Sequence, residues 1–176
     1  MSRKTLGVFA LVLAPAVLLA QKTSYDYDKT ASFDGFKSYA LRDGTSVGDP
    51  LIDKRIVAAL ESELKAKGLA PNDANPDVAV LYHVAFDKEK DISAWSSGGG
   101  RYGYRWGGGW GTTDVRVSEI LVGTLVIDIA DAKNNAVVWR GIGVKEVDVQ
   151  AKPDKREKNI NEAVKKILKN YPPKAK

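Results

Sequence analysis

The chain has 176 residues, a formal net charge of +5, and contents of 44% hydrophobic and 28% charged residues. This balance is typical of one folded domain and excludes a disordered chain, in which hydrophobic residues are scarce. The sequence contains no cysteine, which excludes disulfides, thiolate metal sites, cysteine nucleophiles and the diacylglycerol anchor of a lipoprotein.

Residues 1–20 predict a secretory signal peptide. Two basic residues precede an apolar run that ends at Ala20, the pattern of a leader that is cleaved before Gln21. The run is too short to be a confident membrane anchor. We therefore expect residues 21–176 to form a single exported domain, periplasmic or secreted, soluble after cleavage and without a transmembrane segment or a lipid anchor.

The rest of the chain predicts seven elements. In chain order they are a strand at 23–28, a short strand at 37–42, a helix that starts after Asp49, a strand at 78–86, a long strand at 115–131, its hairpin partner at 137–149 and a helix at 154–170. The order ββαβββα favours an α+β fold, with a largely antiparallel sheet and both helices packed on one face.

Local signals set the limits of the first helix. Asp49 is a typical N-cap, and Pro50 suits the first helical position. Gly68 provides the left-handed stop, after which Leu69 can fold back onto the last turn. Apolar residues recur every four positions between these ends, at Ile52, Ile56, Leu60 and Leu64.

The later strands differ in character. Residues 78–86 are apolar on both alternating faces, as in a central strand, and the charged segment 87–93 follows it. Residues 115–131 are too long for a simple strand, so a bend at Gly123 is expected. The turn at 131–136 is rich in residues that tolerate positive φ and predicts a hairpin.

Several phrases together resemble a known bacterial family. They are YDYDKTASFDGFKSYAL, PDVAVLYHVAF, the Gly-aromatic segment, VGTLVIDIADAKNNAVVWRGIG and AVKKILKNYPPK, and in this order they resemble the envelope domain called DUF4136. The resemblance implies an exported α+β domain and carries over no catalytic residue. Many relatives are lipoproteins, and this chain departs from them by lacking the lipobox cysteine.

The segment 96–113, SSGGGRYGYRWGGGWGTT, is the candidate binding site. Tyrosine, tryptophan and arginine side chains can form a stacking and cation–π surface for sugars, a protein partner or single-stranded nucleic acid. Export argues against nucleic acid. The alternative is a mobile or self-packed loop without a dedicated ligand. The candidate ligand-binding residues are Arg101, Tyr102, Tyr104, Arg105, Trp106 and Trp110.

Other motifs indicate little chemistry. Residues 98–103 match G-x-G-x-x-G, but a nucleotide site needs a strand before the motif and a helix after it, and here a strand follows. His83 is the only histidine, which excludes metal sites with two imidazoles. It lies in an apolar strand, where a structural histidine is the favoured interpretation.

The acidic residues leave two alternatives open. Asp26 and Asp28 share one face of a strand, close to Asp34, and could bind a cation, but the following loop lacks the calcium-loop pattern. One of the pair could instead serve a hydrolase together with His83. Two further acids, Asp128 and Asp131, flank the hairpin turn and are interpreted as turn formers.

The sequence therefore predicts an exported, non-enzymatic envelope domain that acts by binding, with no cofactor and no metal. An envelope protein or a glycan is the expected partner, and nucleic acid is not. A glycan-binding module that uses the segment 96–113 is the main alternative, and a hydrolase that uses His83 with Asp26 or Asp28 is the lesser one.

Overall fold

The computed structural model describes residues 21–46, 48–95 and 114–174. Its strands are β1 (Lys22–Tyr27), β2 (Ser38–Leu41), β3 (Ala70–Pro71), β4 (Val78–Trp95), β5 (Asp114–Asp131) and β6 (Ala136–Glu146). Its helices are α1 (Pro50–Ala66) and α2 (Pro153–Ile167), with short 3₁₀ turns at Phe33–Gly35 and Leu168–Asn170.

The strands form one six-stranded sheet in the order β1-β6-β5-β4-β2-β3. Three neighbouring pairs are antiparallel, whereas β2 runs parallel to both β4 and β3. The α+β class and the largely antiparallel sheet are therefore confirmed. Strand β3 was not predicted, because two residues inside a segment rich in proline and asparagine carry no strand pattern.

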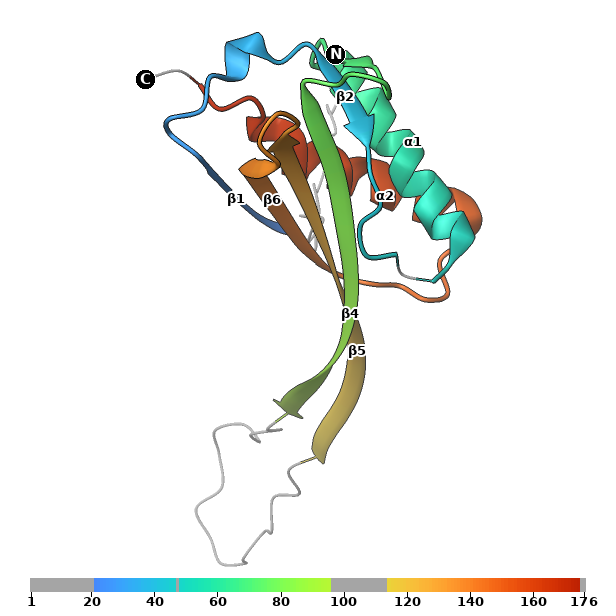
Figure 1. Cartoon of the computed structure of the whole chain (residues 1–176). Helices are drawn as coiled ribbons and strands as arrows, with labels where there is room; N and C mark the ends of the chain where they lie inside the picture. Colours follow the sequence, from blue (N-terminus) through green and yellow to red (C-terminus); the bar gives the residue numbers. More distant parts are fainter. Residues whose placement is uncertain (1–20, 47, 96–113, 175–176) are drawn as a thin grey trace, which may run out of the picture.

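Both helices cover the same face of the sheet (Figure 1), as the sequence indicated. The predicted signals at the ends of α1 are present: the Asp49 carboxylate accepts the N–H groups of Leu51 and Ile52. Gly68 has a φ of +86°, and Leu69 is buried against the helix end. These local hydrogen bonds fix where α1 starts and stops.

A row of large side chains crosses five strands beneath the helices. The register aligns Tyr27, Trp139, Ile129, Val80 and Leu41 as successive neighbours from β1 to β2. From α1 and from the C-terminal part of the chain, the residues packed on this row are Ile56, Ala59, Leu60, Leu64, Val164, Ile167, Leu168 and Tyr171. This layer is the hydrophobic core and the main source of stability.

Strands β4 and β5 run far beyond the rest of the sheet. Strand β6 ends where Glu146 pairs with Val122, after which β4 and β5 pair only with each other, from Lys88↔Leu121 to Trp95↔Asp114. We call this two-stranded extension, residues 88–95 and 114–121, the arm (Figure 1). The sequence interpretation that ended the strand at residue 86 is wrong, because cross-strand pairing extends it through the charged residues.

The sequence predicts a bend of the long strand at Gly123, but the irregularity in the pairing of β5 lies elsewhere. Pairing of β4 with β5 continues through Gly123, and the shift in register lies between Ile129 and Ala130, opposite β6. The hairpin turn itself is confirmed, since Asn135 takes a φ of +56°. Within the described ranges, no helix is long and apolar enough to cross a membrane.

Truncating a core residue of α1 tests this packing. Leu60 is fully buried and Leu51, in the same helix, is 64% exposed. We expect Leu60→Ala to lower the free energy of unfolding by about 2–5 kcal/mol, and Leu51→Ala to change it by less than about 0.5 kcal/mol. Urea denaturation followed by circular dichroism measures both. Equal losses would contradict the packing described.

Candidate functional site

An apolar pocket lies between the first turns of the two helices and the sheet. Its volume is about 310 Å³, at the lower end of the range for small-molecule sites. The apolar residues that line it come from α1, α2, three strands and the segment after β6: Ile52, Ile56, Val84, Phe86, Leu121, Gly123, Leu125, Gly143, Val147, Val149, Ile160 and Ala163.

The pocket exists because the helical cover of the sheet is incomplete here. Toward the C-terminal end of α1, Leu60 and Leu64 are fully buried, whereas Ile52 near its start is only partly buried. Across the pocket, Val84, Leu125 and Ile160 are also partly buried. The same apolar stripe that builds the core therefore continues past it as a pocket wall.

Two glycines shape the sheet side of the pocket. A Cβ atom on Gly123 would lie 2.9 Å from Val147 Cγ2, and one on Gly143 would lie 2.7 Å from Ile167 Cδ1. Such distances are below van der Waals contact, so a larger residue would clash with the segment after β6 at Gly123 and with α2 at Gly143. Gln21, which follows the predicted leader, also lines the pocket and lies near Gly143.

Apolar side chains extend from the pocket to the surface. Phe86 is 38% exposed and Val149 is 59% exposed, and both line the pocket. An exposed apolar rim around an apolar hollow is typical of a surface that binds something.

Polar groups sit at the pocket edge. Lys145 Nζ donates to Asn159 Oδ1 at 2.8 Å, which links β6 to α2. Arg156 donates from Nε to the carbonyl of Ala151 at 2.9 Å and from Nη2 to that of Val149 at 2.7 Å. The guanidinium of Arg156 thus holds the segment that forms one wall of the pocket.

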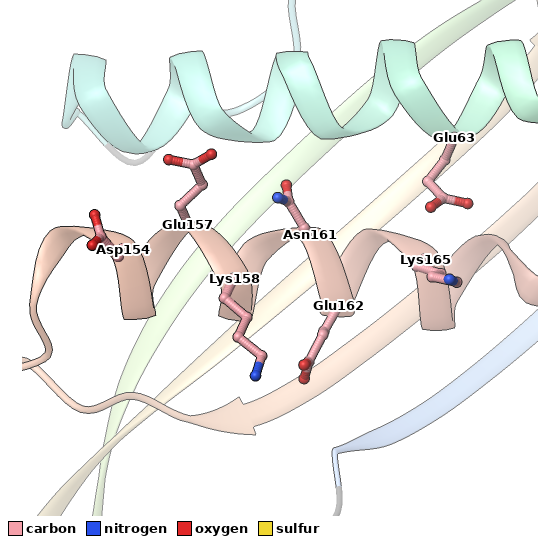
Figure 2. Close-up of a pocket in the computed structure, with 7 residues that line it drawn as sticks. All are labelled: Glu63, Asp154, Glu157, Lys158, Asn161, Glu162 and Lys165. Carbon is pink, nitrogen blue, oxygen red and sulfur yellow. The ribbon is translucent and has the colours of Figure 1, made fainter.

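A second hollow, of about 500 Å³, separates α1 and α2 on the outer side (Figure 2). Its lining is polar: Glu63, Asp154, Glu157, Lys158, Asn161, Glu162 and Lys165. All but one of these residues come from α2, and Figure 2 shows their side chains spread around that helix. A lining made only of charged and amide side chains is typical of a solvated helix face.

The opposite face of the sheet carries a cluster of polar side chains. Asp128 is only 4% exposed, and Arg140 donates to its two oxygens from Nε and Nη2, at 2.6 Å each. These hydrogen bonds and the carboxylate charge raise the pKa of the Arg140 guanidinium. The interpretation of Asp128 as a turn former is therefore wrong, whereas Asp131 does accept the N–H of Lys133 in the turn.

His83 is a half-buried structural residue of β4, as its apolar surroundings indicated. Its Nδ1 accepts the N–H of Thr45 at 3.2 Å and lies 3.0 Å from the Thr45 hydroxyl. In the neutral ring Nε2 therefore carries the hydrogen, and it lies 3.7 Å from Asp128 Oδ2. The sequence offered no signal for this contact, because Thr45 lies 38 residues away in a segment without a strand pattern.

The acids proposed for a hydrolase do not meet His83. Asp26 is in β1, and β6 and β5 separate that strand from β4, a distance of roughly 14 Å at ~4.8 Å per strand. Asp28 binds the backbone and hydroxyl of Thr30 instead. Within the described residues, no three acids or histidines gather as they would around a metal ion.

The six residues proposed from the Gly-aromatic segment cannot be placed in the site. Arg101, Tyr102, Tyr104, Arg105, Trp106 and Trp110 all lie outside the described residues. The segment 96–113 connects the distal ends of the two arm strands.

The family model described as "Domain of unknown function (DUF4136)" matches residues 23–173, and the chain belongs to this family. The resemblance seen in the sequence is thereby confirmed. No curated protein matches the chain.

Two solved structures share the fold. A PDZ domain protein from Parabacteroides distasonis is 17% identical, with a TM-score of 0.58; the match covers 89% of this chain but only 37% of that one. A PelC dodecamer from Paraburkholderia phytofirmans is 14% identical, with a TM-score of 0.51, and the match covers 85% of this chain and 95% of that one. At such identities the likeness concerns the fold alone.

Removing Arg140, the partner of the buried Asp128 carboxylate, tests the role of the polar cluster. Arg140→Leu leaves the Asp128 carboxylate buried without its guanidinium, and we expect a loss of about 1–3 kcal/mol in unfolding free energy. The control is Arg42→Leu, which removes a more exposed ion pair with Asp73 at 3.9 Å and should cost under about 1 kcal/mol. Chemical denaturation measures both. An unchanged free energy of unfolding in Arg140→Leu would show that the ion pair with Asp128 does not stabilise the fold.

Proposed function

We propose that this chain is an exported, non-catalytic domain of the bacterial cell envelope that acts by binding, and that the apolar pocket is its binding site. The pocket is the observation that carries the proposal. Its lining is mostly aliphatic, it opens to an exposed apolar rim, and both helices and three strands contribute to it. Contact between water and an apolar lining is unfavourable. Replacing the water with an apolar group therefore lowers the free energy of the system.

The polar groups support binding rather than catalysis. His83, Asp128 and Arg140 lie on the far face of the sheet from the pocket, and each is held by the hydrogen bonds or ion pairs described above. The pocket lining contains no histidine among the described residues. A general base and a nucleophile within reach of one another are what a hydrolase would need there.

Localisation in the envelope is supported by the leader. The N-terminal 20 residues have the charge and hydropathy pattern of a signal peptide. Gln21, the first residue after the predicted cleavage, lines the pocket. The exported form would therefore begin beside its own binding site.

Glycan binding through the segment 96–113 is the second candidate function. The arm favours it, because eight residue pairs of β4 and β5 extend beyond the body of the sheet, up to the residues Trp95 and Asp114 that flank this segment in the chain. At ~3.3 Å per residue the arm is roughly 25 Å long. A two-stranded ribbon of this kind is marginally stable in water, so contact with a partner would stabilise it.

Filling the pocket tests the proposed site. We expect the uncharged fluorescent probe N-phenyl-1-naphthylamine to bind the full chain, expressed with its own leader, in a saturable manner. Ala163 lines the pocket, and Ala163→Phe should weaken this binding at least tenfold, since the ring would occupy the space.

The matched control is Ala58→Phe, the same change at an exposed position of α1 outside the pocket, which should leave probe binding unchanged. Circular dichroism and thermal unfolding establish that both variants are folded. Undiminished binding to folded Ala163→Phe would remove the pocket from the proposal.

Titration with envelope glycan fragments tests the second candidate. If the Gly-aromatic segment binds glycan, tryptophan fluorescence should shift on titration and Trp106→Ala should weaken the response. Ala163→Phe serves as the control, because a change in the apolar pocket should not affect a site formed by the segment 96–113. An absent shift in the unmodified chain would exclude this candidate.

A further inference from the structure

The pocket edge carries two cations that are not neutralised by acids. Lys145 has the neutral side chain of Asn159 as its hydrogen-bond partner. Arg156 uses its guanidinium to bind main-chain carbonyls. Among the described residues, no carboxylate lies within ion-pair distance of either group.

The two acids next to them do not compensate this charge. Asp148 is paired with Lys155 at 2.9 Å, and its other partner is the backbone N–H of Gln150. Glu146 also lines the pocket, but it follows Lys145 in β6, where strand alternation directs neighbouring side chains to opposite faces, and it forms no ion pair with Lys145 or Arg156 among the described residues. Both acids line the pocket together with the two cations, and with Lys155, which neutralises Asp148, the pocket edge has an excess of one positive charge.

The interior suits an unbranched hydrocarbon. Apart from Phe86 at the rim, the apolar lining is aliphatic. A sugar would need several hydrogen-bonding groups in the pocket lining, because burying a polar group without a hydrogen-bond partner costs free energy. A methylene group takes up about as much space as a water molecule in the liquid, ~30 Å³. The volume of about 310 Å³ therefore suits roughly ten chain carbons.

We propose that the occupant of the pocket is a single-chain fatty acid, whose alkyl chain lies between the helices and the sheet and whose carboxylate lies at Lys145 and Arg156. This inference rests on the proposed binding function and adds the chemical class of the ligand. The charge at the edge selects the headgroup, and the aliphatic interior selects the chain. An alcohol of the same length would fill the pocket equally well but would gain nothing from the two cations.

Calorimetric titration of the full chain with three twelve-carbon ligands tests the contribution of the headgroup separately from that of the alkyl chain. The ligands are dodecanoate, 1-dodecanol and dodecyltrimethylammonium, each below its micellar concentration at pH 8. We expect dodecanoate to bind at least tenfold more tightly than the alcohol, the cation to bind most weakly, and the preference for dodecanoate to shrink as salt is added.

Single substitutions then locate the headgroup. Lys145→Gln should reduce the preference for dodecanoate over the alcohol at least threefold and leave the affinity for the alcohol unchanged. Lys158→Gln is the control, since it removes the same charge from α2 at the outer, polar hollow and should change neither affinity. Arg156→Gln removes the charge and also the hydrogen bonds that hold the pocket wall. Arg156→Lys keeps the charge, so comparing the two variants separates the effect of the charge from the effect on the wall.

Each result decides between the two proposals. Equal affinity for dodecanoate and the alcohol, both lost in Ala163→Phe, would overturn the fatty-acid inference and leave the binding pocket standing. No binding of any of the three ligands would overturn the inference, and the absence of probe binding as well would overturn the proposed function. A preference for dodecanoate that survives both Lys145→Gln and Arg156→Gln would overturn the assignment of the headgroup site.

Discussion

The fold depends on covering one apolar face of the sheet with two helices that are much shorter than its longest strands. A strand of 18 residues such as β4 spans about 60 Å, whereas a helix of 17 residues such as α1 spans only about 25 Å. The helices can therefore cover the row that contains Trp139, but not the whole of β4 and β5. Where the cover ends, the apolar stripe of the sheet forms the wall of a pocket, and β4 and β5 continue beyond it as the arm, so both features follow from the same mismatch in length.

The two faces of the sheet differ in how their polar side chains are arranged. On the face away from the helices, Asp128 is buried because the guanidinium of Arg140 satisfies both of its oxygens, and His83 is held by Thr45. These groups satisfy one another and stabilise the sheet face that neither α1 nor α2 covers. On the helix face the polar groups stay at the edge of the pocket, and the interior is left apolar. The proposed binding would be driven by burial of apolar surface, and the edge charges would select among apolar ligands.

The pocket could not be predicted from the sequence, although every residue that lines it was visible there. Ile52, Val84 and Ile160 each fit the pattern of a core-facing position, and nothing in that pattern distinguishes a residue packed on its neighbours from one that faces a cavity. The difference arises from how far the helices reach along the sheet, and that depends on contacts between segments more than 60 residues apart. The Gly-aromatic segment, by contrast, was conspicuous because its composition is local.

The sequence by itself determined the features that depend on neighbouring residues. The carboxylate of Asp49 caps α1, Gly68 ends it, and Asn135 adopts the positive φ of the hairpin turn, all through interactions that span a few residues. Only the tertiary structure decided the rest. Pairing with β5 kept the charged residues after Phe86 in a strand, pairing with β6 placed Arg140 on Asp128, and the reach of two helices left a cavity open. Each of these depends on which distant segment becomes a neighbour, and a short window of sequence does not contain that information.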